Sequence, residues 1–152
     1  MSISVGELAP DFTLTSHKGN QVTLSEFRGK SPVVLVFFPF AFSGVCTGEL
    51  CELRDNIEIF KAQGVELFGV SIDSKYALAK FAQAEGYDFQ LLADFWPHGE
   101  VASRYGVFLE DKGFCTRGTF VINKEGELAA KFITSPGEAR DLAAYKKALE
   151  LL

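Results

Sequence analysis

The stretch VVLVFFPFAFSGVCTGELCEL, which runs from Val33 to Leu53, decides the fold and contains the first candidate for chemistry. Its opening part, Val33 to Phe38, is an uninterrupted run of apolar residues, mostly β-branched or aromatic, which is typical of a strand buried on both faces. Pro39 cannot donate to a sheet ladder, so we expect the strand to end there.

The residues that follow Pro39 predict a helix that opens at or near Cys46 and stops at Gly64. Apolar residues recur along it at helical spacing. These are Leu50, Leu53, Ile57 and Phe60. Cys46 is therefore expected in the first turn, just beyond the carboxyl end of a central strand. Backbone N–H groups and the positive end of the helix dipole meet there, and both favour a thiolate, the nucleophilic form of cysteine.

Length, composition and charge indicate one globular domain, residues 1–152, and argue against several classes of function. The 15 Lys and Arg residues against 20 Asp and Glu give a net charge of −5 without a basic cluster, which argues against a nucleic-acid partner. No apolar run approaches the ~20 residues that span a bilayer. The N-terminus lacks the pattern of a signal peptide, and an odd count of three cysteines then favours a reducing cytoplasm.

Strands and helices alternate along the chain and predict an α/β sandwich, in which helices flank a mixed central sheet. The turn Lys18-Gly19-Asn20 predicts an N-terminal hairpin, and Asn123-Lys-Glu-Gly126 predicts a second one. Expected strands are 12–15, 21–24, 65–72, 89–92, 114–122 and 128–133, and expected helices are 75–85, 100–105 and 138–151. Sites in such sheets lie at the carboxyl ends of strands, where Pro39 to Cys46 is expected.

The spacing Pro39-x-x-x-Ser43-x-x-Cys46 resembles the motif of the peroxiredoxins, Pro-x-x-x-Thr/Ser-x-x-Cys. Arg117 in TRGTFVI fits the arginine of that family, and Glu49 follows the cysteine by three residues, as in many members. The segments FFPFAFSGVCTGEL and DFWPHGEVASRYGVF resemble the alkyl hydroperoxide reductase E type, and the similarity covers essentially the whole chain. The resemblance implies a thioredoxin-like fold, cytoplasmic peroxide reduction, no metal or organic cofactor, and often a dimer.

Peroxide reduction needs a thiolate, a dry pocket and donors that stabilise charge moving along the O–O bond. Cys46 is the predicted nucleophile, and its attack on one oxygen gives a sulfenic acid. Arg117 offers a fixed charge and several donors that keep the sulfur ionised and polarise the peroxide. Glu49, about one turn along the helix, is expected to orient Arg117.

Three further groups are expected to line the pocket. Ser43 offers a hydroxyl that both donates and accepts, although the family prefers threonine, whose methyl stiffens the rotamer. Pro39 forms a wall without a competing N–H. The N–H groups of Val45 and Cys46 are expected to form a cradle for negative charge.

Each of these residues also has an ordinary structural interpretation. Cys46 alone suits a small buried apolar position, and Arg117 alone suits a solvated strand. Ser43 suits a helix cap, Pro39 the end of a strand, and Glu49 an acid beside the helix dipole.

Two further features are weaker candidates for function. His98 has no metal-ligand spacing around it, so we expect no metal site there. Phe42, Phe95 and Trp96 are more typical of a core or of a homodimer contact than of substrate specificity.

Cys51 follows Cys46 at the position where the Q-type (bacterioferritin-comigratory) peroxiredoxins have their resolving cysteine, whereas the E type is usually described as a one-cysteine enzyme. Helical Cα atoms at i and i+5 are ~8.7 Å apart, beyond the ~7 Å limit for a disulfide, so the helix must unwind first. Gly48 weakens that helix by ~1 kcal/mol relative to alanine. Cys115, expected to share a strand face with Arg117, is a second candidate, and an external thiol is a third.

The expected substrate is hydrogen peroxide, an organic hydroperoxide or peroxynitrite, with thioredoxin, a glutaredoxin-like protein or a low-molecular-weight thiol as reductant. A thiol–disulfide oxidoreductase on the same fold is an alternative, but it normally has Cys-x-x-Cys. A redox-sensing binding protein is another, and it would react with peroxide as slowly as a free thiol. A cysteine hydrolase is disfavoured because no signature places a histidine.

Overall fold

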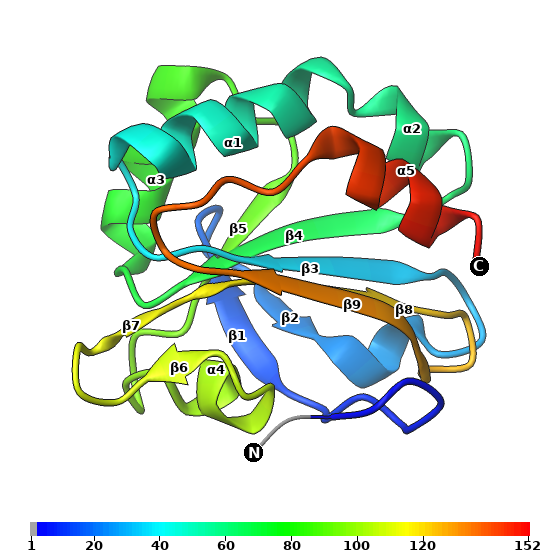
Figure 1. Cartoon of the computed structure of the whole chain (residues 1–152). Helices are drawn as coiled ribbons and strands as arrows, with labels where there is room; N and C mark the ends of the chain where they lie inside the picture. Colours follow the sequence, from blue (N-terminus) through cyan, green and yellow to red (C-terminus); the bar gives the residue numbers. More distant parts are fainter. Residues whose placement is uncertain (1–2) are drawn as a thin grey trace.

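The computed structural model describes residues 3–152, and its centre is a seven-stranded mixed β-sheet (Figure 1). In spatial order the strands are β2 (Gln21–Thr23), β1 (Thr13–Ser16), β5 (Gln90–Ala93), β4 (Glu66–Ser71), β3 (Val33–Phe37), β8 (Arg117–Ile122) and β9 (Leu128–Thr134). The central strand β3 runs parallel to β4 and antiparallel to β8. The two predicted hairpins are confirmed as β1–β2 and β8–β9.

The strand β3 is buried along its whole length because apolar side chains cover both faces of the sheet. Leu35 and Phe37 belong to one apolar cluster, whereas Val34 and Val36 belong to the cluster on the opposite face. The uninterrupted apolar run therefore supplies two layers of core at once, as its sequence predicts.

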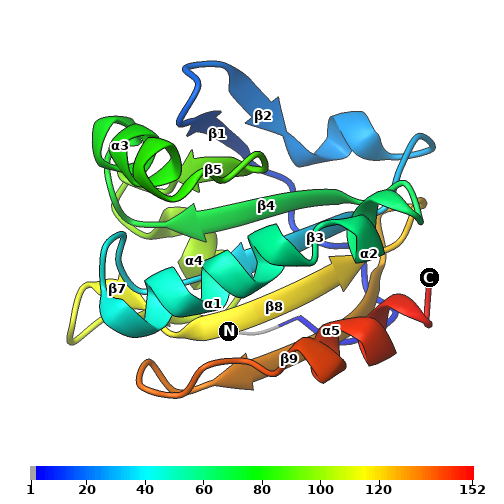
Figure 2. The same ribbon diagram turned by 90° about the horizontal axis from the view of Figure 1, so that it is seen from above.

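The helices cover the two faces of the sheet unequally (Figures 1 and 2). The face that carries Val34 is covered by α1 (Gly44–Asp55), α2 (Glu58–Lys61), α3 (Lys75–Glu85) and α5 (Leu142–Leu149). The opposite face is covered by α4 (Glu100–Arg104), the 3-10 helix η1 (Leu24–Phe27) and the ribbon of β6 (Phe108–Leu109) and β7 (Phe114–Cys115). Across residues 3–152, no helix has the length and apolar character needed to cross a membrane.

The helix expected up to Gly64 is in fact two helices, which is a correction to the sequence prediction. α1 ends at Asp55, and Asn56 leaves the helical conformation with φ −120°. The side-chain amide of Asn56 donates to the carbonyl of Glu52 at 2.8 Å, so it supplies a hydrogen bond to one of the last carbonyl groups of the helix. The apolar spacing continues into α2, which explains why the break is invisible to a periodicity argument.

Two further boundaries differ from expectation. The strand expected over 114–122 is interrupted at Thr116, because β7 pairs with β6 whereas β8 pairs with β3 and β9. The last helix begins at Leu142 and not at Glu138, because the Asp141 side chain caps it by accepting the N–H of Ala143 at 3.1 Å.

The pairing of β3 with β8 positions the candidate site. Phe37, the last residue of β3, lies opposite Gly118, the second residue of β8. The loop that leads from Pro39 into α1 therefore starts beside Arg117, where the carboxyl end of one strand meets the amino end of its neighbour.

Candidate active site

Cys46 lies in the first turn of α1, and its side chain is fully buried. The helix begins at Gly44, and the first helical hydrogen bond runs from the N–H of Thr47 to the carbonyl of Ser43 at 2.9 Å. The N–H groups of Val45 and Cys46 precede that bond and point out of the end of the helix. The local setting predicted for Cys46 is therefore present.

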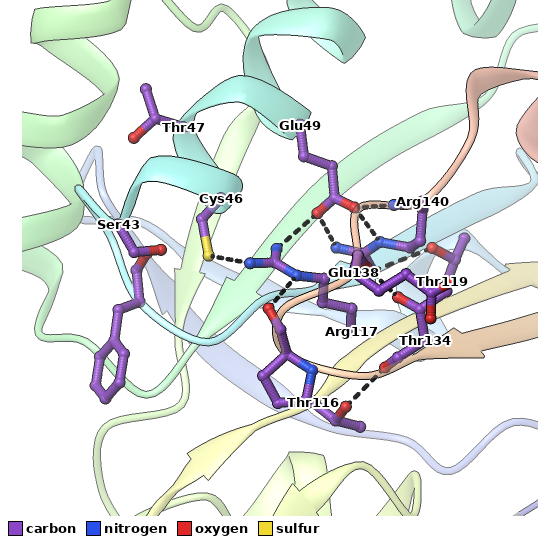
Figure 3. A network of polar contacts seen from close by, with 12 residues as sticks. Ser43, Cys46, Thr47, Glu49, Thr116, Arg117, Thr119, Thr134, Glu138 and Arg140 are labelled. Carbon is purple, nitrogen blue, oxygen red and sulfur yellow. Dashed lines mark hydrogen bonds and ion pairs between the residues drawn. The ribbon is translucent and has the colours of Figure 1, made fainter.

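Arg117 enters the site from the first position of β8, and it is 1% exposed. Its Nη2 donates to Sγ of Cys46 at 3.1 Å, and its Nη1 donates to Oε1 of Glu49 at 2.9 Å (Figure 3). Its Nε donates to the carbonyl of Pro136 at 2.8 Å. Two partners on α1 and one in the segment after β9 fix the plane of the guanidinium, so Nη2 is held facing the sulfur.

Glu49 joins Arg117 to a second buried arginine, Arg140 (Figure 3). The backbone N–H and Nε of Arg140 donate to Oε2 of Glu49 at 2.6 and 2.9 Å, and Nη2 donates to Oε1 at 2.5 Å. Burial works to raise the pKa of Glu49, but the hydrogen bonds and charge of Arg140, together with the charge of Arg117, hold it below its usual value. Glu49 is therefore an anion at neutral pH.

The charges of this buried group balance when the sulfur of Cys46 is anionic. The two guanidinium groups of Arg117 and Arg140 carry two positive charges, and Glu49 compensates one of them. All four residues are at most 6% exposed, so water does little to compensate the other charge. Because an unbalanced charge is costly in a low-dielectric interior, the arrangement favours the thiolate.

A cavity of about 250 Å³ opens beside this group. It is lined by Pro39, Phe40, Ser43, Gly44, Val45, Phe114, Arg117 and Pro136. The Ser43 hydroxyl donates to the carbonyl of Phe40 at 3.2 Å and does not cap α1, so its lone pairs are available to accept from a ligand. Pro39 is buried in the wall, and Phe42 turns the loop with φ 70°, a conformation that is rare for a bulky residue.

Cys51 lies on the same helix as Cys46 but faces a different neighbour. It is partly buried, and its Sγ lies 3.4 Å from Oε1 of Glu85 near the end of α3. All three cysteines of the chain are free thiols. Because α1 is intact between Cys46 and Cys51, the two residues are too far apart for a disulfide unless the helix unwinds, as predicted.

The prediction that Cys115 shares a strand face with Arg117 is wrong. Cys115 is fully buried in the apolar cluster on the opposite side of the sheet from Cys46, because the chain leaves β7 at Thr116 before it enters β8. Burial also raises the pKa of the Cys115 thiol. The geometry therefore argues against Cys115 as the partner of an oxidised Cys46.

Arg140 is the residue of this group that the sequence reasoning missed. It lies 91 residues after Glu49, in the segment before α5, and no motif surrounds it. The one available signal is the carboxylate itself. Glu49 has two oxygens to satisfy in a buried position, and Arg117 occupies only Oε1, which implies a second donor.

The remaining candidates lie outside the site. His98 places Nε2 2.8 Å from the carbonyl of Gly113 and packs against Phe108. Within the described residues, no cluster of three or more His, Cys, Asp or Glu side chains is arranged to hold a metal ion. Phe42, Phe95 and Trp96 are 54%, 53% and 81% exposed, so the interpretation of these three as core is wrong.

Comparison with known proteins decides the family. Residues 5–131 match the AhpC/TSA family. The chain belongs to this family. Alkyl hydroperoxide reductase E of Mycobacterium tuberculosis is 42% identical to it over 150 residues, which are 99% of this chain and 98% of the relative. Peroxiredoxin Bcp of Escherichia coli is 34% identical over 137 residues, which are 86% of this chain and 85% of the relative. Both resemblances stated from the sequence are thus confirmed.

Solved structures of other peroxiredoxins share the fold. The crystal structure of peroxidoxin BcpB from Mycobacterium tuberculosis matches with a TM-score of 0.84 and 32% identity, covering 98% of this chain and 96% of that one. The structure of Enterococcus faecalis AhpC matches with a TM-score of 0.88 and 26% identity, covering 99% and 92%. The predicted thioredoxin-like fold is confirmed, and this peroxiredoxin is a thiol-dependent peroxidase.

Proposed function

We propose that this peroxiredoxin reduces hydrogen peroxide and organic hydroperoxides, and also peroxynitrite, through Cys46. The thiolate sulfur bonds to one peroxide oxygen and the O–O bond breaks. The other oxygen leaves and takes a proton to become water or an alcohol, or leaves as part of nitrite when the substrate is peroxynitrite. The sulfur, oxidised by two electrons, becomes a sulfenic acid. The observation that carries the proposal is the 3.1 Å contact between Nη2 of Arg117 and the buried sulfur.

Groups around the cavity supply the stabilisation that this step needs. The charge of Arg117 and the N–H groups of Val45 and Cys46 stabilise the negative charge that moves from sulfur to the leaving oxygen. The Ser43 hydroxyl accepts a hydrogen bond from the peroxide, and Pro39 closes the wall without offering a competing donor. No metal or organic cofactor takes part in the proposed step.

Glu49 and Arg140 act as positioning residues in this proposal. Glu49 holds Nη1 of Arg117, and Arg140 holds both oxygens of Glu49. A rigid carboxylate between two guanidinium groups keeps Nη2 directed at the sulfur, which lowers the reorganisation needed when peroxide arrives.

The experiment that tests the peroxide step is a stopped-flow reaction of the reduced protein with peroxide. Wild type and Cys115→Ala are expected to react with the same second-order rate constant, whereas Cys46→Ser is expected to show no reaction. A rate constant for wild type equal to that of a free thiol, or retained reaction in Cys46→Ser, contradicts the proposal.

We infer that Cys51 resolves the sulfenic acid after the first turns of α1 unwind. Cys51 is partly exposed and lies on the same helix, whereas Cys115 lies beneath the opposite face of the sheet. An external thiol remains the alternative route. Mass spectrometry after one equivalent of peroxide is expected to find a Cys46–Cys51 disulfide in wild type. An intramolecular disulfide in Cys51→Ser, or persistent sulfenic acid in wild type, excludes Cys51.

The proposed partners follow from this cycle and from the surface. The disulfide needs a reductant, which we propose is thioredoxin, a glutaredoxin-like protein or a low-molecular-weight thiol in the cytoplasm.

The exposed rings of Phe42, Phe95 and Trp96 support a homodimer contact. Sedimentation is expected to show a dimer in wild type and a monomer in Trp96→Glu, and equal masses would remove Trp96 from the contact.

A further inference from the structure

The segment Glu85–Tyr87, which starts at the last residue of α3, holds the turn of α1 that separates Cys46 from Cys51. Figure 2 shows α1 and α3 on the same side of the sheet. The Tyr87 hydroxyl donates to the carbonyl of Thr47 at 3.2 Å and lies 3.5 Å from Sγ of Cys51. In an α-helix the Thr47 carbonyl also accepts the N–H of Cys51. Tyr87 therefore binds the helical turn that must open before the two sulfurs can meet.

The side chain of Tyr87 is itself fixed. It is 6% exposed, its ring stacks on Phe89 at 5.2 Å between centroids, and it meets the ring of Phe81 edge-on at 5.2 Å. Gly86 ends α3 in the left-handed conformation with φ 69°. This reversal brings both Glu85 and Tyr87 against α1, where Glu85 contacts Cys51.

A second contact strengthens the same attachment. Nη1 of Arg54 donates to the carbonyl of Glu85, and Sγ of Cys51 donates to its carboxylate at 3.4 Å. The second and third turns of α1 are thus attached to α3, whereas its first turn carries Cys46. Opening of α1 is therefore expected to proceed from the Cys46 end, where Arg117 and Arg140 also hold Cys46 and Glu49. Among the contacts with the Glu85–Tyr87 segment, the bond from Tyr87 to Thr47 lies nearest that end.

We propose that Tyr87 is a positioning residue that restrains α1 after Cys46 is oxidised and so sets the rate of disulfide formation. This inference rests on the proposed role of Cys51. In the step concerned, the thiol sulfur of Cys51 bonds to the sulfenic sulfur of Cys46, and the sulfenic oxygen leaves with the thiol proton as water. No further oxidant is required. While Tyr87 keeps the turn closed, the sulfenic acid stays exposed to a second peroxide molecule, which oxidises it to a sulfinic acid.

The test is Tyr87→Phe, which keeps the ring and removes only the hydroxyl. Quenched-flow alkylation of thiols measures peroxide reaction and disulfide formation separately. The second-order rate with peroxide is expected to be unchanged, and disulfide formation is expected to be about fivefold faster, as for one net hydrogen bond. The sulfinic fraction formed at excess peroxide should fall in proportion.

Tyr105→Phe is the matched control. Its hydroxyl donates to the carbonyl of Pro10 at 2.7 Å, and its ring is fully buried in the cluster on the other face of the sheet. Both variants lose one bond from a tyrosine to a backbone carbonyl, so a general loss of stability affects both. Only Tyr87→Phe is expected to change the rate of disulfide formation.

Hydrogen exchange of the reduced proteins separates the possible failures. The Cys51 amide should exchange about fivefold faster in Tyr87→Phe than in wild type, whether or not a disulfide later forms. Unchanged exchange together with unchanged disulfide formation overturns the inference. Faster exchange without a Cys46–Cys51 disulfide in any variant overturns the role of Cys51, and with it the control of resolution by Tyr87.

Discussion

The guanidinium of Arg117 contacts three groups, two of them on α1 and one in the segment after β9. It donates to the sulfur of Cys46, to the carboxylate of Glu49 and to the carbonyl of Pro136. A planar fork can serve three directions at once, whereas the ammonium of lysine is a single point at the end of a flexible stem. The geometry therefore depends on arginine and not merely on a positive charge.

Arg117→Lys is expected to slow the oxidation of Cys46 by peroxide about 10²–10³-fold, because a directed donor at the reacting atoms is lost while a charge remains nearby. Stopped-flow measurement of the second-order rate constant checks this. Arg104→Lys is the control, since Arg104 pairs with Glu100 on the surface. An Arg117→Lys rate within twofold or so of wild type would show that charge alone suffices.

The sequence revealed most of these residues because they belong to a short motif or lie close to one. Cys46, Ser43 and Pro39 are fixed by spacing, and Glu49 follows within one helical turn. Arg140 is not predictable from the sequence, because its role arises only when the chain folds back and buries it against Glu49. A solvated arginine and a buried one look the same in sequence, and nothing local distinguishes them.

At the scale of elements, α1 combines two opposed requirements. Its first turn must be formed to aim the N–H groups of Val45 and Cys46, yet it must open if Cys51 is to reach the oxidised sulfur. Gly48 lies between the two cysteines and lowers the stability of the intervening turn. A methyl group at Gly48 would meet nothing within 4 Å, so packing does not require glycine there.

Gly48→Ala is expected to stabilise the protein by about 1 kcal/mol and to slow disulfide formation about fivefold, with little change in the reaction with peroxide. Urea unfolding and quenched-flow alkylation measure the two effects. The double variant with Tyr87→Phe is expected to return towards the wild-type rate, because the two changes act on the same turn in opposite directions. A faster disulfide in Gly48→Ala would contradict the requirement for unwinding.

The bounds of a helix or strand are predictable where one sequence pattern dominates, and they are predicted wrongly where two patterns indicate different bounds. The strand β3 followed directly from an uninterrupted apolar run. The break at Asn56 did not, because apolar residues at helical spacing continue past it while the Asn56 side chain ends the helix. Pro136 and Gly137 predict a start of α5 at Glu138, whereas the helix begins after Asp141, whose side chain caps it.

At the scale of the whole molecule, the buried charges lie between the sheet and its helical cover. Glu49 comes from α1, Arg117 from β8 and Arg140 from the segment before α5, so one group joins three parts of the fold. These buried charges also contribute to the free energy of unfolding. Removing one member of a buried ion pair leaves the others uncompensated, which is costly.

Glu49→Gln is expected to lower the free energy of unfolding at neutral pH by about 3–5 kcal/mol. Because the pKa of Glu49 lies below its ordinary value of 4.5 in the folded state, its contribution is complete above that value and is lost as the pH falls through the folded pKa. The gap between wild type and variant should therefore narrow in acid. Urea unfolding across this range measures it.

Glu100→Gln is the control for this pH series, because Glu100 forms an exposed pair with Arg104. It is expected to change the free energy of unfolding by about 1 kcal/mol or less at any pH. A constant gap between wild type and Glu49→Gln from neutral to acid pH would mean that the carboxylate makes no net contribution through its charge.

The pairing of β3 with β8 also has a consequence during synthesis on the ribosome. Arg117 is added 71 residues after Cys46, and Arg140 is added 91 residues after Glu49. A nascent chain that lacks these arginines has the cysteine but not the cations that activate it in the proposed mechanism. On that mechanism, unfinished copies are expected neither to consume oxidant nor to suffer irreversible damage at the rate of the finished enzyme, because fast reaction requires both arginines.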